Sequence, residues 1–214
     1  MNRFIHSFLI IVMSVFYISA ISLPDYDRST ETSTEIVQKQ MIALNKVSSN
    51  RQIRYYDINH YTDLQLMNSI TADQINDILE YWNYYSDDDI PFRYNGQIFI
   101  DASRETGLDP VYILAHAGLE SAWGNSYYAR NYHNYFGIGA FDYDPDNAIN
   151  YSNDSMREGI IEGAKWIKEN YYNEGQTCLY SMRYNNGYNE YCTSETWSDE
   201  IVRIIQTSYS LISS

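Results

Sequence analysis

The chain has 214 residues, of which 44% are hydrophobic and 16% are aromatic, and its formal net charge is −14. This length is enough for one globular domain with a real core and some additional segments. The negative charge argues against nucleic acids and anionic membrane surfaces as partners, because both would repel the chain.

The N-terminal segment has the pattern of an export signal. Arg3 supplies a positive start, and residues 8–20 form an uncharged apolar run that ends in small residues. The run is short for a membrane span, so a cleaved signal peptide over residues 1–22 is favoured over an uncleaved anchor. Residues 23–54 are polar and rich in Ser and Thr, and we interpret them as a linker. We therefore expect a secreted or envelope-associated protein whose folded domain spans residues 55–214.

The folded domain is predicted to be mainly helical. Capping-box patterns begin two helices, at Thr71 and at Ser155. Helical spacing of apolar residues and helix-end signals predict helices, in chain order, from Thr71, over 96–106, from Asp109, over 155–172, over 176–183 and over 195–210. Residues 127–151 are rich in Tyr, Asn, Gly and Asp, and they predict a loop region with a short β-hairpin.

The segment from Asp109 to Ser126 carries the clearest chemical signal. Asp109 is a good N-cap residue, Pro110 suits the first helical position, and Gly124 is a plausible end. The residues between are almost all apolar, which predicts a helix buried on most sides. Glu120 is its single carboxylate, and desolvation there would raise its pKa toward the value that a general acid needs. The local pattern alone leaves a structural role for Glu120 equally open.

Four sequence blocks resemble bacterial peptidoglycan N-acetylglucosaminidases of glycoside hydrolase family 73, which includes autolysin and flagellar muralytic domains. They are, in order, Leu119–Ser126, Asn134–Asp142, Glu162–Ile167 and Thr177–Tyr184 with the following Glu190–Thr193. The resemblance covers residues 57–206. It implies a mainly α (α+β) fold, in which a lysozyme-like helical lobe and a small β-hairpin lobe bound a cleft. It also implies hydrolysis of the β-1,4 bond between N-acetylglucosamine and N-acetylmuramic acid.

The resemblance assigns Glu120 as the general acid and leaves its partner open. Asp142 is the first choice for a second catalytic carboxylate, and Asp154 is the next, although Asp154 also precedes a capping box. Tyr191 matches a family tyrosine near the reaction centre, with core packing as the alternative. Catalysis by the substrate's own acetamide would need no second protein group.

Several further residues are assigned roles in or near the site. The residues assigned to substrate binding are Trp123, Asn134, Tyr135, Phe136, Gly137 and Ile138. His116 lies one helical turn before Glu120 and either tunes that carboxyl or is a satisfied core histidine. Arg183 is interpreted as structural, bonding a buried acid.

The cysteines are expected to form a disulfide. Export permits the bond, and Cys178 and Cys192 each replace a residue that is usual in the family, with buried free thiols as the alternative. We expect no cofactor and no metal, because the four histidines are scattered and form no Cys/His ligand cluster.

Peptidoglycan glycan strands are the expected partner, and the chain is expected to be a monomer. A lytic transglycosylase or a muramidase on the same core is an alternative, and so is a catalytically inactive glycan-binding module.

Overall fold

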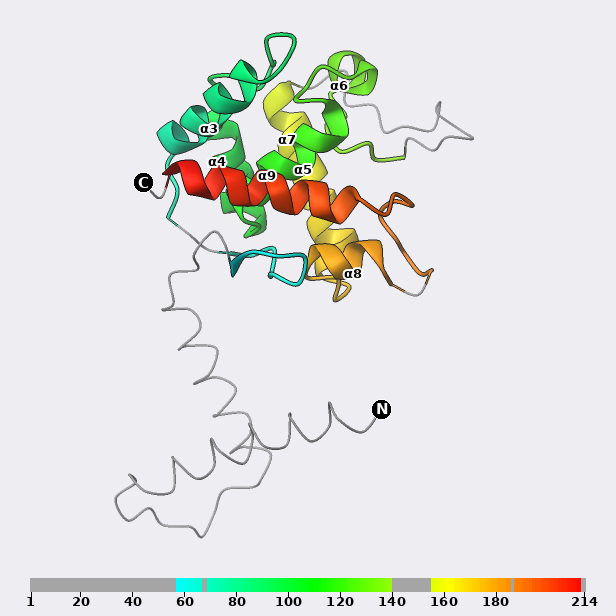
Figure 1. Cartoon of the computed structure of the whole chain (residues 1–214). Coiled ribbons are helices and arrows are strands. Elements are labelled where there is room, and N and C mark those ends of the chain that lie inside the picture. The colour runs from blue at the N-terminus through cyan, green and yellow to red at the C-terminus, as the bar shows by residue number, and fades with distance from the viewer. Residues whose placement is uncertain (1–56, 67–68, 140–154, 186, 213–214) are drawn as a thin grey trace, which may run out of the picture. The chain divides into compact units, whose positions relative to one another are not determined.

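The computed structural model describes residues 57–66, 69–139, 155–185 and 187–212. The predicted signal peptide and the whole of the predicted linker therefore lie outside the described residues, as do residues 140–151 of the predicted loop and hairpin region. The described helices are α3 (Ala72–Tyr84), α4 (Gly96–Thr106), α5 (Pro110–Ser121), α6 (Tyr127–Tyr132), α7 (Met156–Ile167), the π-helix η3 (Lys168–Tyr172), α8 (Leu179–Arg183) and α9 (Trp197–Ile212) (Figure 1). Extended pairing in these ranges is limited to an isolated bridge between Asp63 and Cys178. The prediction of a mainly helical domain is confirmed for this part of the chain.

Local capping chemistry sets the helix ends that the sequence predicted. The Thr71 hydroxyl accepts from the Gln74 backbone, and the Gln74 side chain accepts in return from the Thr71 backbone. Ser155 and Glu158 form the same reciprocal box at the start of α7. These boxes satisfy backbone N–H groups that a helix leaves unpaired in its first turn.

Two predicted elements differ from the structure. Residues 127–132, predicted as loop, form the short helix α6, because the Ser126 hydroxyl caps it by accepting from the Ala129 backbone. Helix α8 begins at Leu179 rather than at residue 176. None of the helices in the described ranges has the length and apolarity to cross a bilayer.

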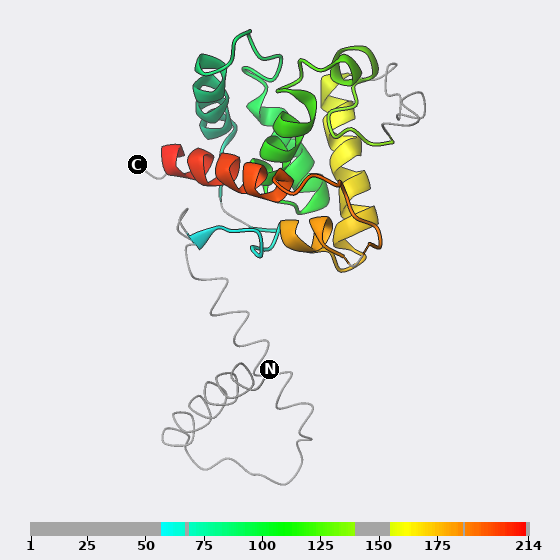
Figure 2. The same cartoon turned by 45° about the vertical axis from the view of Figure 1, so that its right-hand side comes forward.

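Helix α5 lies at the centre of the helical body. It contacts α4 and α9, while α4 also contacts α3 and α7 (Figure 2). Every residue of α5 is buried except Leu119 and Glu120. The predicted burial of this helix is therefore confirmed, and its only carboxylate lies at the one turn that is partly open.

Asp109 fixes the N-terminal end of α5 to α9. Its Oδ1 accepts from the backbone N–H groups of Val111 and Tyr112, at 2.9 and 3.0 Å. Its Oδ2 accepts from the Tyr209 hydroxyl on α9 at 2.5 Å. Burial raises the pKa of the Asp109 carboxyl to about 6, and these hydrogen bonds act in the opposite direction.

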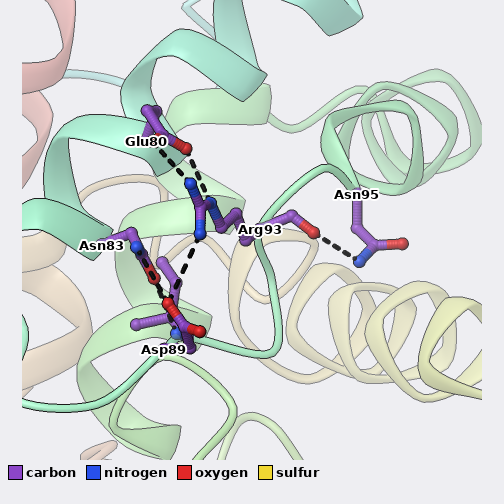
Figure 3. A network of polar contacts seen from close by, with 6 residues as sticks. Glu80, Asn83, Asp89, Arg93 and Asn95 are labelled. Atoms are coloured by element: carbon purple, nitrogen blue, oxygen red, sulfur yellow. Dashed lines mark hydrogen bonds and ion pairs between the residues drawn. The ribbon is translucent and has the colours of Figure 1, made fainter.

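A polar network holds the loop between α3 and α4. The Arg93 guanidinium pairs with both carboxylate oxygens of Glu80 at 2.7 Å and with Asp89 at 3.4 Å (Figure 3). Such exposed pairs add little stability, but a bidentate pair restricts geometry. The loop presents Phe92 to the core, where its ring would lie 3.0 Å from a Cβ built on Gly124. The loop therefore supports the turn that directly follows Glu120.

Candidate active site

Glu120 occupies the last turn of α5, and its side chain is 22% exposed. Burial raises the pKa of the Glu120 carboxyl from an ordinary value of 4.5 to about 7, and a hydrogen bond from Trp197 acts to lower it. Desolvation dominates because little water reaches the carboxyl. At mildly acidic pH the group is therefore protonated, as a general acid must be.

A tight turn after α5 redirects the chain beside Glu120. Ala122 and Trp123 have left-handed backbone conformations, with φ of 49° and 57°, followed by Gly124 at 91°. Left-handed conformations of residues with a Cβ are costly and persist only where surrounding contacts impose them. Here the buried Ser121 hydroxyl accepts from the Gly124 backbone at 2.8 Å and donates to the Ala117 carbonyl. The helix thus ends at Ser121, three residues before the glycine expected to end it.

Trp197 is the direct partner of Glu120. It begins α9, is 4% exposed, and donates its indole N–H to Glu120 Oε1 at 2.6 Å. Sequence analysis did not identify this residue as part of the site. A buried tryptophan needs an acceptor for its N–H, and that requirement is the only sequence signal that pointed to a polar contact.

Tyr191 completes this side of the site. Its ring stacks on Trp197 with centroids 5.0 Å apart, and it contacts His116 edge-on at 4.5 Å. Its hydroxyl donates to the Phe136 carbonyl. Burial raises the pKa of Tyr191 well above its ordinary value, so the phenol is neutral. Tyr191 therefore lies beside the Glu120 and Trp197 pair. Its hydroxyl also holds the loop over residues 134–139 in place.

The loop over residues 134–139 brings a backbone turn against the carboxyl. The Asn134 side chain donates to the Ile138 carbonyl at 2.8 Å and accepts from the Ile138 N–H at 3.0 Å, closing the turn. Gly137 has φ of 64°, and a Cβ built on it would lie 3.4 Å from Glu120 Oε2. Glycine therefore allows a left-handed turn immediately beside Glu120.

The side chains of this loop face the core. Asn134, Tyr135, Phe136 and Ile138 are 1–4% exposed. Substrate contact by these four side chains stays a prediction, and in the structure they support the turn around Gly137.

Two glycines of α7 receive this loop. A Cβ on Gly159 would lie 2.3 Å from the His133 carbonyl oxygen, and one on Gly163 would lie 2.3 Å from the Phe136 ring. Both distances are far below van der Waals contact, so only glycine permits this packing. The packing of Gly163 against Phe136 explains why the Glu162–Ile167 block contains a glycine within an otherwise regular helix.

Trp123 lies on the other side of the turn. Its ring stacks on Trp82 with centroids 5.0 Å apart and covers Gly118. It is partly buried, and its predicted stacking on a sugar stays a prediction.

The predicted second carboxylates lie outside the described residues. Neither Asp142 nor Asp154 is placed, so the choice between them stays open. Among the described residues, no group of three His, Cys, Asp or Glu side chains is arranged to hold a metal ion.

The predicted disulfide is wrong, because Cys178 and Cys192 are both free thiols. The Cys178 sulfur faces the Ser181 hydroxyl within the first turn of α8, at 3.4 Å, whereas the Cys192 sulfur lies 3.9 Å from the Ser194 carbonyl. Each thiol is thus engaged locally.

Arg183 has a structural role, as expected, but its main partners are backbone carbonyls and its acidic neighbour is only partly buried rather than a buried acid. The side chain donates to the carbonyls of Ser194 and Thr193, at 2.6 and 2.7 Å, and approaches Glu190 at 3.6 Å. It thereby orders the segment between Tyr191 and α9.

Comparison with known proteins gives independent support for the resemblance to glucosaminidases. A model of the Glucosaminidase family, described as mannosyl-glycoprotein endo-beta-N-acetylglucosaminidase, matches residues 96–210. A putative endo-beta-N-acetylglucosaminidase of Streptococcus pneumoniae serotype 4 is 36% identical over 111 residues, which are 51% of this chain and 16% of the relative. The bifunctional autolysin of Staphylococcus aureus is 34% identical over 140 residues, covering 55% of this chain and 11% of the relative. The chain thus spans only a small part of these relatives.

A solved structure shares the fold. The S. aureus autolysin E, in complex with a muropeptide, NAM-L-Ala-D-iGlu, superposes with a TM-score of 0.63 and 26% identity. The match covers 73% of this chain and 74% of that one. Because the family model extends from α4 into α9 and covers more than half of the residues, the chain belongs to the glucosaminidase family of glycoside hydrolases, family 73.

Proposed function

We propose that this chain is an exported peptidoglycan hydrolase that cleaves the β-1,4 bond between N-acetylglucosamine and N-acetylmuramic acid. The observation that carries the proposal is the Glu120 carboxyl, whose pKa burial raises to about 7, at the partly open end of a buried helix. Family membership and the muropeptide bound to the related autolysin E support the substrate class. Export is inferred from Arg3 and the apolar run over residues 8–20.

The proposed chemistry begins with protonated Glu120. Its proton passes to the glycosidic oxygen as the bond from the anomeric carbon to that oxygen breaks, giving an oxocarbenium-like state. Water then adds to the anomeric carbon, and the proton that it loses passes to the group that activates it or returns to the Glu120 carboxylate. Asp142, Asp154 or the substrate acetamide would stabilise the cation or activate the water, and Tyr191 is positioned to order the surrounding loop.

Product analysis tests this function directly. Purified protein is incubated with peptidoglycan sacculi, and the products are reduced with borohydride and identified by mass spectrometry. We expect reduced N-acetylglucosamine at the new ends. Reduced muramic acid ends would indicate a muramidase, anhydro-muramic ends a lytic transglycosylase, and no release at all an inactive binding module; each of these results would contradict the proposal.

The control is Glu120→Gln, which keeps the side-chain shape and an oxygen acceptor for the Trp197 N–H but has no acidic proton. We expect this variant to fold normally and to lose activity by at least about a hundredfold, the lower range for general acid catalysis. Activity near that of the unchanged protein would remove Glu120 from the reaction.

A further inference from the structure

His116 presents an unusual buried group beside Glu120. The side chain is fully buried, and Nε2 is the one buried side-chain nitrogen or oxygen in the described ranges that has no hydrogen-bond partner. Leaving such a group unpaired costs about 1–3 kcal/mol. An unpaired polar atom in the core therefore calls for a functional explanation.

The other ring nitrogen reveals where the imidazole proton resides. His116 Nδ1 lies 2.9 Å from the Tyr112 hydroxyl, which also lies 3.5 Å from the Met182 sulfur. We assign the tautomer in which the Tyr112 hydroxyl donates to Nδ1, because an imidazole nitrogen is a much better acceptor than a thioether. Burial lowers the pKa of His116 to about 3, so the ring is neutral and carries one proton. That proton is then on Nε2, which makes the unpaired atom a donor.

The Nε2 donor faces the catalytic carboxyl. Glu120 Oε1 is 4.0 Å away, and it already accepts from the Trp197 indole at 2.6 Å. Four aromatic rings surround the imidazole, those of Tyr191, Trp197, Phe136 and Tyr112, with centroids at 4.5, 5.3, 5.5 and 5.5 Å. Because the imidazole is neutral, the contact with Glu120 is not an ion pair. A closure of about 1 Å would convert it into a normal hydrogen bond.

We propose that His116 is a positioning residue that provides a reserve hydrogen-bond donor, engaged by the Glu120 carboxylate once Glu120 has given up its proton. The inference rests on the proposed function, since it concerns the same proton transfer. A protonated carboxyl needs few donors, but the carboxylate left behind carries a full charge in a site with little water. The Trp197 N–H supplies one donor to it, and the His116 N–H supplies the second. Tyr112 maintains the required tautomer.

The other titratable groups around His116 and Glu120 do not titrate in the pH range where the activity profile should shift. Among the described residues they are Tyr112 on α5, Tyr171 in η3, and Tyr191 and Cys192 ahead of α9. Burial raises the pKa of each above its ordinary value, that of Tyr171 to about 12. These groups stay neutral between pH 5 and pH 8, so a shift of the activity profile there reports Glu120.

The test compares pH profiles of kcat and KM on peptidoglycan fragments for His116→Phe and His116→Gln. Phe retains the ring packing and lacks the donor, whereas a Gln amide can donate to Glu120 and accept from Tyr112. For His116→Phe we expect a kcat roughly tenfold lower and an alkaline limb about one pH unit higher, with KM little changed, because donors to a carboxylate favour its charged form. His116→Gln should restore most of both values.

The outcomes separate this inference from the proposed function. An inactive unchanged protein would contradict the proposed function. An active protein that is silenced by Glu120→Gln, but whose His116→Phe variant keeps the normal kcat and alkaline limb, would overturn only the role of His116.

Tyr112→Phe decides the matter if His116→Phe does not fold, because it removes only the hydroxyl that fixes the tautomer. A smaller shift in the same direction supports the proposal, and an unchanged profile overturns it. Nitrogen NMR of histidine-labelled protein gives a readout independent of activity. We expect a protonated, pyrrole-type Nε2 for His116, and a pyridine-type Nε2 would contradict the proposal.

Discussion

Replacing Trp197 with phenylalanine would test how the site sets the acidity of Glu120. The indole N–H donates to Glu120 Oε1 at 2.6 Å, and this bond lowers the pKa of the carboxyl against the larger effect of burial. Trp197→Phe removes the donor and keeps a ring that can still stack on Tyr191. The pKa of Glu120 should therefore rise above about 7.

The size of the shift follows from the energy of the bond. A hydrogen bond to a charged group contributes about 1.5–3 kcal/mol, and one pKa unit corresponds to about 1.4 kcal/mol. We therefore expect an upward shift of about one to two units. A general acid must be protonated, so activity is lost as the pH rises through this pKa. The alkaline limb of kcat/KM should move from about pH 7 toward about pH 8–9.

The assay is the initial rate of peptidoglycan fragment cleavage across pH 5 to pH 10. Trp166→Phe is the matched control, because Trp166 is a partly buried tryptophan on α7 whose ring packs on Tyr171. It should leave the alkaline limb in place. An unchanged or lowered limb for a folded Trp197→Phe variant would refute the reasoning that links the indole to the acidity of Glu120.

Three further predictions concern packing and pH. Gly163→Ala should destabilise the fold by about 1–3 kcal/mol and lower activity, because the new methyl group overlaps the Phe136 ring. The control is Glu162→Ala, a change at the exposed neighbouring residue, which should shift the urea midpoint little. Gly137→Ala should cost about 1–2 kcal/mol for its left-handed backbone, as thermal melts would show. It should also lower kcat, as rate assays would show, because the strained turn lies in contact with Glu120. The pKa of Asp109 is about 6 in the folded protein, above its value in the unfolded chain. The free energy of unfolding should therefore fall as the pH rises from about 4 to 6, and Asp109 should account for about 3 kcal/mol of that fall. Urea unfolding between pH 4 and pH 8 should show a smaller loss of stability for Asp109→Asn than for the unchanged protein, and the remaining loss should come from Glu120. An equal loss in both proteins would contradict the raised pKa of Asp109.

Local patterns were sufficient for most of the described helices and for the position of Glu120 in its helix. The capping boxes at Thr71 and Ser155 and the Asp109 N-cap each act within one helical turn, so they can be identified without knowledge of the fold. The apolar surroundings of Glu120 follow from its own helix, and they predicted both its burial and the direction of its pKa shift. Helix α6 was missed because polar, tyrosine-rich segments carry a weak helical pattern, and only the Ser126 cap indicated it.

The partners of that acid depended on packing between distant segments. Trp197 is 77 residues beyond Glu120, and the Tyr191 hydroxyl bonds a carbonyl 55 residues earlier in the chain. The disulfide prediction failed for a different reason: closeness in sequence does not bring two sulfurs into bonding geometry, and each thiol contacts its own local partner instead.

The sequence alone thus determined that a single carboxylate, that of Glu120, lies in a buried apolar helix, since hydrophobic periodicity and capping are local properties of the chain. Its role as the general acid came from the family resemblance and stays a proposal. The tertiary structure decided how that acid is held. It placed the Trp197 indole on Glu120, turned the His116 Nε2 toward the same oxygen, and brought the Gly137 turn beside the carboxyl. Hydrogen bonding and desolvation of a buried group depend on every segment packed around it, and no single stretch of sequence specifies that environment.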